Sequence, residues 1–531
     1  MFSRFFHPKM IDYSLYLVTG RELLPPGQDY FDSLEQALQG GVTVVQIREK
    51  NADTGEFLDI ALRSKVICDR YNVPLIVNDR VDIALAVQAA GVHVGQTDMP
   101  VSIARNLLPE GTIIGVSCNN LQEIEKAIND RADYVGIGAI WSTTTKNLNK
   151  PIVGVRRVGE LLQKLDGTSI KAVGIGGIKS SNLLRTLHGS VSTTNRALDG
   201  VAVVSEIVAS TRPREAASKL CEILSTFRNS GSIPNAMSTR SDYSVENVLD
   251  GVIQIMSCVR EHNPLVHQIT NNVSIAQSAN ATIALGASPI MATTAQEMED
   301  LSVINGALLV NIGTLVSSAY EGMILAGSCA NARKKPVVFD PVGIGASQFR
   351  KSAVNSLLNT WQASVIKGNA GELAALSGSN EVQSKGVDSI GSGFKDPISF
   401  VRNVARKERC VVVMSGKTDY ISDGTNVAVL TNGHELLGRI TGSGCIAGSC
   451  IASYCAGAMI LARGENQEGK LALGDVFLGA IGGILALTIS AELASLREDV
   501  KGPGTFFPAL IDELSTLSTR NIRERARIQI Q

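Results

Sequence analysis

The sequence has almost no net charge, few aromatic residues and no cysteine pairs at metal-binding spacing. Its 531 residues include 49 Lys and Arg against 50 Asp and Glu, so the formal net charge is −1. Proteins that bind nucleic acid or an anionic membrane through their charge are normally far more basic, so neither partner is expected. The nine cysteines form no CxxC pair, which argues against a disulfide framework and a structural zinc site.

A secretory leader and a clear membrane span are also missing. The N-terminus has no apolar run followed by a small-residue cleavage site. Gly442–Ala462 and Val476–Ala491 are apolar, but the first consists of small residues and the second is short and flanked by Asp475 and Glu492. Hydrophobic residues make up 44% of the chain, which excludes general disorder. We expect a cytoplasmic, globular protein in which both stretches are buried core helices.

The composition changes around Phe227–Glu246, which is rich in Ser, Asn, Gly and Pro and poor in aliphatic residues. Such a stretch is typical of a linker between domains. The sequence therefore predicts one domain over residues 1–228, a linker over 229–243 and a second domain over 244–531.

Short β-branched runs alternate with helical patterns in the first half. The expected strands are Ser14–Thr19, Val42–Glu49, Pro74–Asn78, Gly91–Gly95, Ile113–Ser117, Tyr134–Ile137, Ala172–Ile175 and Gly200–Val204. Eight β/α units in about 210 residues predict a (β/α)₈ TIM barrel. Nearly every run ends in a polar or glycine residue, and in a barrel these ends meet on the face where active sites lie.

The residues at that face suggest two anion sites. Asp79 and Asp98 follow neighbouring strands and suit Mg²⁺, while basic and hydroxyl side chains nearby suit a polyphosphate. Gly176–Gly177 and Val204–Ser205 follow the last two strands, where barrels commonly bind a phosphate monoester. The alternatives are that Asp79 caps a helix and that the glycines only turn the chain.

In these residues the first half resembles thiamine-phosphate synthase (thiamine-phosphate pyrophosphorylase). The matching segments are YLVTG (16–20), QIREK (46–50), NDR (78–80), GVHVGQTDM (91–99), IGVSC (114–118), DYVGIGAIWSTTTK (133–146) and GIGGI (174–178). Trp141-Ser142 stands where the family commonly has Phe-Pro, and Cys118-Asn119 after Ser117 is a second departure.

The resemblance implies roles for named residues. The aminopyrimidine diphosphate would be bound by Gln46, Arg48, Lys50, Asn78, Ser117 and Lys146, with Mg²⁺ held by Asp79 and Asp98. The thiazole phosphate would be held by Thr143, Thr145, Gly177, Val204 and Ser205. The implied reaction is displacement of pyrophosphate from the pyrimidine methylene by the thiazole nitrogen.

The second half combines short apolar strands with long helices rich in Ala, Leu and Gly. The expected strands are Ala307–Asn311, Pro336–Asp340, Ser364–Lys367, Cys410–Ser415 and Ala428–Leu430. This pattern predicts a doubly wound α/β sheet. ITGSGC (440–445) opens a helix whose N-terminus suits an anion, and Cys445 there could accept a proton beside a transferring phosphoryl group. The alternative is that Cys445 only fills space, like Cys450 and Cys455.

The second half resembles hydroxyethylthiazole kinase, which has the ribokinase-like fold. The matching segments are PLVHQITNNV (264–273), ALGASPIMA (284–292), NIGTL (311–315), VVFDPVGIGAS (337–347), VIKGNAGELAAL (365–376), SGKTDYISDG (415–424) and ITGSGC (440–445). The resemblance implies that Cys445 is the catalytic base. It also implies Asp340 and Glu372 for Mg²⁺, Lys367 and Ser415 for ATP, and Met291 and Gly442 for the thiazole alcohol.

Two positions depart from the kinase pattern. Lys367 stands where the family usually has Arg, which loses a bidentate fork and predicts weaker ATP binding, and Ser415 stands where Thr is common. His267 and Asn271 are further candidates for the pocket, although His267 could equally be a core histidine with satisfied hydrogen bonds.

The sequence therefore predicts a bifunctional thiamine biosynthesis enzyme that uses Mg²⁺ in both domains and ATP in the second. The resemblance also implies a homo-oligomer, a trimer or a multiple of three. One alternative is that one half is a catalytically inactive ligand sensor or scaffold. Another is an enzyme pair on the same folds with other substrates.

Overall fold

The computed structural model describes residues 11–145, 150–230, 243–385, 388–390, 393–465 and 468–531. It divides into two compact units, Met1–Ile233 and Pro234–Gln531. Most of the predicted linker, and Lys146 among the predicted site residues, lie outside the described residues.

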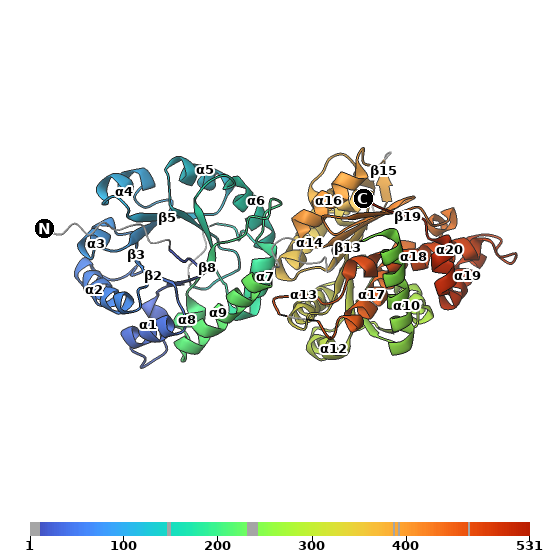
Figure 1. Ribbon diagram of the computed structural model, residues 1–531, viewed down its shortest axis with the longest axis horizontal. Coiled ribbons are helices and arrows are strands. Elements are labelled where there is room, and N and C mark those ends of the chain that lie inside the picture. Colours follow the sequence, from blue (N-terminus) through green and yellow to red (C-terminus); the bar gives the residue numbers. More distant parts are fainter. Residues whose placement is uncertain (1–10, 146–149, 231–242, 386–387, 391–392, 466–467) are drawn as a thin grey trace. The chain divides into compact units, whose positions relative to one another are not determined.

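Unit 1 is a closed barrel of parallel strands in sequential order, with β8 paired to β1. Helices α1–α9 surround the strands (Figure 1). The strands are β1 (Leu15–Val18), β2 (Val44–Ile47), β3 (Leu75–Asn78), β4 (Gly91–Val94), β5 (Ile113–Cys118), β6 (Tyr134–Ile137), β7 (Lys171–Ile175) and β8 (Gly200–Val203). The helices are α1 (Tyr30–Gln39), α2 (Thr54–Arg70), α3 (Val81–Ala86), α4 (Val101–Leu107), α5 (Leu121–Asn129), α6 (Val155–Lys164), α7 (Ser180–Gly189), α8 (Ser205–Val208) and α9 (Pro213–Asn229).

The predicted barrel is confirmed, and each strand lies within two residues of its predicted bounds. Alternating residues divide between two layers because successive strand side chains face opposite sides. On β1, Leu15 and Leu17 pack outward against the helices, whereas Tyr16 and Val18 face the barrel interior. Tyr134 fills that interior together with Tyr16. The centre of the barrel is therefore packed.

Unit 2 contains a nine-stranded sheet in the order β10-β9-β11-β12-β13-β16-β17-β18-β19. The strands from β10 to β16 are parallel, and β17, β18 and β19 continue the sheet antiparallel. The bounds are β9 (Leu265–Ile269), β10 (Ser288–Ile290), β11 (Ala307–Asn311), β12 (Val337–Asp340), β13 (Val365–Asn369), β16 (Val411–Ser415), β17 (Asp419–Ser422), β18 (Val427–Leu430) and β19 (Ile528–Ile530). A separate hairpin pairs β14 (Gln383–Lys385) with β15 (Asp388–Ile390).

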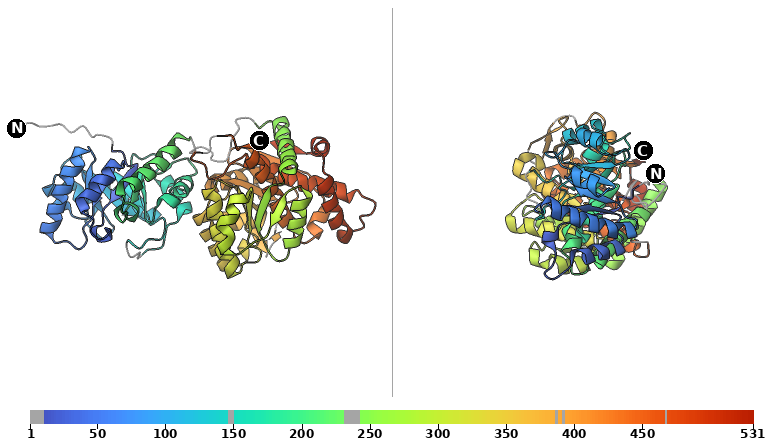
Figure 2. Two further views of the ribbon diagram at one scale, coloured as in Figure 1. Left: turned by 90° about the horizontal axis from the view of Figure 1, so that it is seen from below. Right: turned by 90° about the vertical axis from the view of Figure 1, so that its left-hand side faces the viewer.

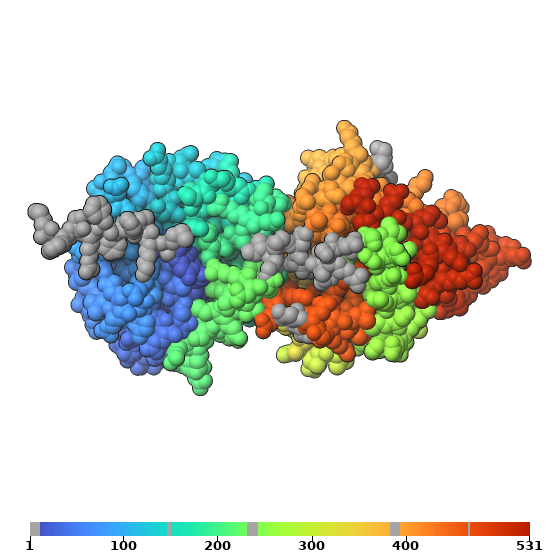
Figure 3. Space-filling model, in the orientation of Figure 1, coloured from blue at the N-terminus to red at the C-terminus, as the bar shows by residue number. Residues whose placement is uncertain are grey.

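Helices cover both faces of this sheet (Figures 1 and 2), so the predicted α/β architecture is confirmed. One face carries α10 (Val245–His262), α11 (Ile275–Ala284), α17 (Ser443–Leu461), α18 (Val476–Ser495), α19 (Pro503–Thr516) and α20 (Thr519–Arg525). The other carries α12 (Met298–Ile304), α13 (Ser317–Ala332), α14 (Gln348–Thr360), α15 (Ala370–Ser377) and α16 (Pro397–Glu408). The first and last helices of the unit, α10 and α20, lie side by side (Figure 3).

The two apolar helices α17 and α18 are long and hydrophobic enough to cross a membrane by composition alone. Most of their residues are buried within unit 2, 83% and 89% of the most apolar windows respectively. A membrane-spanning helix exposes its apolar surface to lipid, whereas these helices bury theirs against each other and against the sheet. They are core helices.

Glycines let α17 and α18 approach closely. A β-carbon at Gly483 on α18 would lie 2.5 Å from the backbone nitrogen and Cα of Ile451 on α17. Backbone atoms cannot give way without a shift of the whole helix.

We expect Gly483→Ala to force α17 and α18 apart and to lower the free energy of unfolding of unit 2 by about 1–3 kcal/mol. Thermal unfolding of the full chain measures this effect. Gly504→Ala is the matched control, because this helical glycine in α19 has no atom within 4 Å of the added β-carbon. Equal melting temperatures for the two variants would contradict the close packing described for Gly483.

Candidate active sites

The ends of β3 and β4 bring the two predicted carboxylates of the barrel together. Asp79 follows β3 with a left-handed backbone (φ 60°), and its N–H donates to the carbonyl of His93 on β4 at 2.8 Å. The N-cap position of α3 belongs to Arg80, so Asp79 does not cap that helix. Asp98 accepts a hydrogen bond from the N–H of Gly95 at 2.8 Å.

The electrostatics of this pair suit a cation. Burial raises the pKa of Asp79, and the nearby Asp98 carboxylate raises it further, while the ion pair with Lys50 opposes both effects. Two carboxylates this close repel each other unless a positive charge lies between or beside them. No cluster of three or more metal-binding side chains occurs among the described residues. A two-carboxylate arrangement is the one Mg²⁺ uses when phosphate and water complete its shell.

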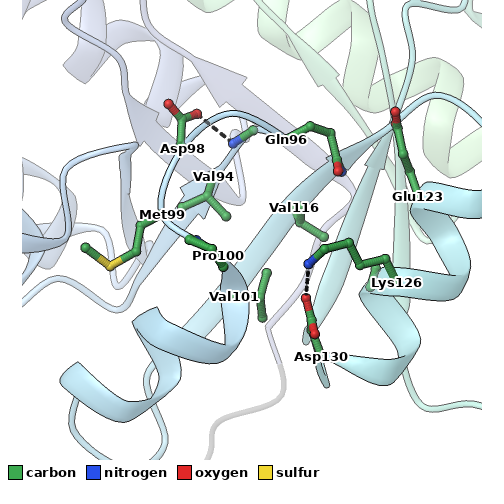
Figure 4. A pocket seen from close by; sticks show the side chains of 12 residues that line it. Val94, Gln96, Asp98, Met99, Pro100, Val101, Val116, Glu123, Lys126 and Asp130 are labelled. Carbon is green, nitrogen blue, oxygen red and sulfur yellow. Dashed lines mark hydrogen bonds and ion pairs between the residues drawn. The ribbon is translucent and has the colours of Figure 1, made fainter.

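A pocket lies beside these residues, between the loop after β4 and helix α5 (Figure 4). Gln96 and Asp98 line it on the loop side. The other side is lined by Lys126 on α5 and by Asp130 at the C-terminal end of that helix, and these two residues form an ion pair. The Asp98 carboxylate points away from that ion pair (Figure 4). Gln96 instead donates to the carbonyl of Ser117 at 2.7 Å, which ties the ends of β4 and β5 together.

The other predicted pyrimidine-diphosphate residues lie at strand ends of the same barrel. Gln46 on β2 and Asn78 on β3 are buried, whereas Arg48 is half-buried and Lys50 is exposed. The backbone N–H of Arg48 donates to the Thr19 hydroxyl at 3.0 Å. The hydroxyl of Ser117 on β5 lies 2.9 Å from Nε2 of His93.

The predicted thiazole-phosphate residues follow β6, β7 and β8. Gly177 has a left-handed backbone (φ 63°), and a β-carbon there would lie 2.3 Å from the carbonyl oxygen of Ser142. Only glycine allows this approach, which brings the loop after β7 against the segment that carries Thr143 and Thr145. Val204 and Ser205 open α8 directly after β8.

In unit 2 the sulfur of Cys445 lies in the first turn of α17 and accepts two hydrogen bonds. They come from the side-chain amides of Asn271, at 3.1 Å, and Asn311, at 3.3 Å. The amide of Asn271 is fixed in this orientation because its oxygen accepts from the backbone N–H groups of Val273 and Ser274. Amide nitrogens can only donate, so the sulfur is held as an acceptor, which is what a base requires.

A buried ion pair extends this cluster along the strand ends. Asn311 also donates to Asp340 at 2.9 Å, and Asp340 lies 3.4 Å from the ammonium of Lys367. Burial alone lowers the pKa of Lys367, but the charges of Asp340 and Glu372 raise it more, so Lys367 stays positively charged. Both oxygens of Glu372 accept backbone N–H groups, from Gly343 and Asn369.

The remaining predicted residues of unit 2 surround this cluster less directly. Gly442 is the left-handed N-cap of α17, and a β-carbon there would meet Ser274. Ser415 ends β16 and donates to the carbonyl of Gly368 at 3.5 Å. Met291 follows the edge strand β10 and is half-buried. His267 donates a hydrogen bond to the carbonyl of Ala292 at 2.9 Å, as expected for a buried core histidine.

Comparison with known proteins covers both units. The profile of thiamine monophosphate synthase matches residues 15–207, and that of the hydroxyethylthiazole kinase family matches residues 256–520. A probable thiamine biosynthetic bifunctional enzyme of Schizosaccharomyces pombe is 39% identical over 98% of this chain and 99% of that protein. The chain belongs to the family of bifunctional thiamine biosynthetic enzymes.

Further relatives agree with this assignment. The thiamine biosynthetic bifunctional enzyme of Saccharomyces cerevisiae is 36% identical over 98% of both chains. A hydroxyethylthiazole kinase of Ruminiclostridium cellulolyticum is 38% identical over 52% of this chain and 96% of its own length. This bifunctional enzyme therefore joins two transferases, a thiamine-phosphate synthase and a hydroxyethylthiazole kinase, and the kinase implies ATP as co-substrate. Nothing in the comparisons supports an inactive sensor or scaffold half.

Sequence reasoning did not find Asn311 or His93 as parts of these sites. Both lie inside predicted motifs, and each is buried with one side-chain nitrogen hydrogen-bonded to a predicted site residue, Cys445 or Ser117. A buried polar residue at the inward-facing position of a strand is the signal that could have identified them.

Asp419, a buried carboxyl group at the start of β17, follows the strand that ends at the predicted ATP residue Ser415. Burial raises the pKa of Asp419 from 3.8 to about 7, although the N–H of Gly416 and the charge of Lys367 oppose the shift. The folded chain therefore holds a proton that the unfolded chain releases between pH about 4 and 7.

We expect the contribution of Asp419 to the free energy of unfolding to be full below pH about 4 and to be lost as the pH rises to about 7. In Asp419→Asn, which cannot ionise but still accepts from Gly416, the unfolding midpoint of unit 2 should depend less on pH over this range. Denaturant titrations at a series of pH values measure the difference. Identical slopes for the wild-type chain and the variant would show that Asp419 does not titrate in this way.

Proposed function

We propose that unit 2 phosphorylates 4-methyl-5-(2-hydroxyethyl)thiazole with ATP, and that unit 1 condenses the product with 4-amino-2-methyl-5-pyrimidinylmethyl diphosphate. The products of the second step are thiamine phosphate and pyrophosphate. The observation that carries this proposal is that, among the described residues, each unit gathers its predicted polar residues at or just after the carboxyl ends of its parallel strands. We assign the first activity to residues 244–531, the second to residues 1–228 and the linker to 229–243.

In the coupling reaction the thiazole nitrogen forms a bond to the pyrimidine methylene as the bond from that carbon to the diphosphate oxygen breaks. Negative charge builds up on the departing diphosphate, so its stabilisation is the main catalytic task. Arg48, Lys50, Lys146 and Ser117 are the donors proposed for that charge. Gln46 and Asn78 orient the pyrimidine. The residues after β6, β7 and β8 hold the thiazole phosphate: Thr143, Thr145, Gly177, Val204 and Ser205.

In the kinase reaction Cys445 accepts the proton of the substrate hydroxyl while that oxygen takes the γ-phosphoryl group from ATP. The two amide donors to its sulfur support this role, because they direct their hydrogens at the lone pairs of the sulfur and so favour it as an acceptor. The positive end of the α17 dipole and the Lys367 ammonium favour the negative charge of the transferring group. Ser415 contributes to the ATP site, and Met291 and Gly442 contribute to the thiazole site.

Mg²⁺ is the metal that both sites fit. Asp79 and Asp98 would hold it in the barrel, and Asp340 and Glu372 would hold it in the kinase unit, all through hard oxygen donors. When bound, Mg²⁺ neutralises phosphate charge in each reaction. The protein's own contribution is to hold those carboxylates in place, as the hydrogen bonds to Asp98 and Glu372 do.

Asp98→Asn should slow coupling by at least about a hundredfold while thiazole phosphorylation is unchanged, because it removes a charge from the diphosphate site only. Cys445→Ala should impair phosphorylation and leave the coupling of supplied thiazole phosphate intact. Separate assays of the two steps on each purified variant provide the measurement.

Two substitutions serve as matched controls for this pair. Asp82→Asn changes an exposed carboxylate on α3 that pairs with Arg80, and Cys450→Ala changes a buried thiol five residues further along α17. Neither should alter either rate by more than about twofold. Loss of both activities in a folded Asp98→Asn or Cys445→Ala chain would refute the assignment of separate sites.

We further propose that the enzyme is cytoplasmic and assembles as a trimer or a multiple of three through unit 2. Support comes from the resemblance to the kinase family and from exposed apolar side chains at the two ends of α11, where Val273 is 64% exposed and Ile283 is 60% exposed. Contact with another subunit would remove this apolar surface from water, which favours association.

Sedimentation equilibrium should therefore give three times the 56.2 kDa of one chain, or a multiple of that value. Val273→Asp/Ile283→Asp should shift the assembly toward the monomer, since burying those charges is costly. A monomeric wild-type chain at micromolar concentration would overturn the oligomer proposal and leave the two activities unaffected.

A further inference from the structure

A continuous chain of hydrogen bonds crosses the inside of the barrel. The amide nitrogen of Gln46 donates to the hydroxyl of Tyr16 at 2.9 Å, and that hydroxyl lies 2.8 Å from the hydroxyl of Tyr134. Tyr134 in turn lies 2.9 Å from Nδ1 of His93, whose Nε2 lies 2.9 Å from the hydroxyl of Ser117. The chain thus joins β2 to β5 through three side chains that have no role in the reaction as described above.

The Gln46 end of this chain sets the direction in which the hydrogens are donated. An amide nitrogen can only donate, so the Tyr16 oxygen accepts from Gln46, and the Tyr134 oxygen at 2.8 Å is the acceptor for the hydroxyl hydrogen of Tyr16. Tyr134 then gives its hydrogen to Nδ1 of His93, which therefore carries its own hydrogen on Nε2. That hydrogen goes to the oxygen of Ser117. The hydrogen of Ser117 is consequently left for an acceptor outside the chain.

The barrel is built to keep these groups in place. A β-carbon at Gly115 would lie 2.0 Å from the Tyr134 ring, and one at Gly136 would lie 3.3 Å from the His93 ring, so glycines make room for both. Tyr16 and Tyr134 are fully buried and their rings pack at 5.9 Å. Polar groups buried at such fixed positions have few alternative partners, which limits the arrangements that the chain can adopt.

We propose that His93 is a positioning residue for the coupling reaction, and that with Tyr134 and Tyr16 it orients the Ser117 hydroxyl as a donor to the diphosphate of the pyrimidine substrate. This inference rests on the role proposed above for Ser117. It adds a reason for three polar side chains in the interior of a barrel that apolar residues would otherwise fill. It also connects Gln46, at the pyrimidine end, to the group that stabilises the leaving diphosphate.

A double-mutant cycle between His93 and Ser117 tests the proposal. Ser117→Ala should lower kcat for coupling by about ten- to a hundredfold, the range for one lost hydrogen bond to a charged group. His93→Leu removes the donor to Ser117 and should lower kcat by about tenfold, with KM for thiazole phosphate unchanged. The double variant should be no slower than Ser117→Ala alone. His93→Gln, whose amide can still donate, should recover much of the rate.

The controls separate positioning from a structural effect. His188 is another buried histidine of the barrel unit and packs against Phe227. In a double variant, the fold-reduction in kcat caused by His188→Gln should multiply with the fold-reduction caused by Ser117→Ala. If the fold-reduction in kcat caused by His93→Leu also multiplies with that of Ser117→Ala, His93 does not act through Ser117 and the inference is wrong. If Ser117→Ala leaves coupling unchanged, the role proposed for Ser117 is wrong as well. The two failures are therefore distinguishable.

The histidine tautomer provides a test that needs no active variant. The chain has six histidines, so a ¹⁵N spectrum of the histidine-labelled full-length protein is assignable to His93 by comparison with His93→Gln. The inference predicts a hydrogen on Nε2 and an unprotonated Nδ1 that accepts a hydrogen bond. A hydrogen on Nδ1 would reverse the direction of the chain and overturn the inference.

Discussion

Polar groups buried at the ends of the parallel strands must find hydrogen-bond partners, and both active sites depend on this constraint. In the kinase unit Asn271, Asn311, Asp340 and Lys367 satisfy one another and leave the sulfur of Cys445 as an acceptor. In the barrel the Tyr16 and Tyr134 hydroxyls are hydrogen-bonded to each other. A buried polar network of this kind has few arrangements. The groups proposed to react are therefore held in position before substrate arrives.

The sequence allowed the fold to be predicted where apolar runs were long and regular. All eight barrel strands were predictable because each is an apolar run and nearly every one is followed by a polar residue or glycine. In unit 2, β9 was missed because it contains His267 and Gln268, and β10 and β19 because they have only three residues each. β17 was missed as well. Edge strands gain less from burial, so their sequences carry a weaker hydrophobic pattern.

The predicted site residues came from motifs, whereas their mutual arrangement came from the structure. No spacing in the sequence indicates that Asn311 bonds the sulfur of Cys445 or that His93 bonds Ser117, because these contacts join residues 134 and 24 positions apart. Gly177 is a similar case, since its need for glycine arises from the approach of Ser142. Which strand ends lie next to each other depends on the order of the strands in the sheet, and the sequence pattern predicts that order only in part.

The central claim is that one chain makes thiazole phosphate in unit 2 and consumes it in unit 1. The most direct test is a product assay on the purified protein with thiazole alcohol, ATP, Mg²⁺ and the pyrimidine diphosphate, each omitted in turn. Thiamine phosphate should require ATP when the alcohol is supplied, and should form without ATP when thiazole phosphate is supplied. If no thiamine phosphate forms from the alcohol with every component present, while supplied thiazole phosphate is coupled, the claim for unit 2 is contradicted.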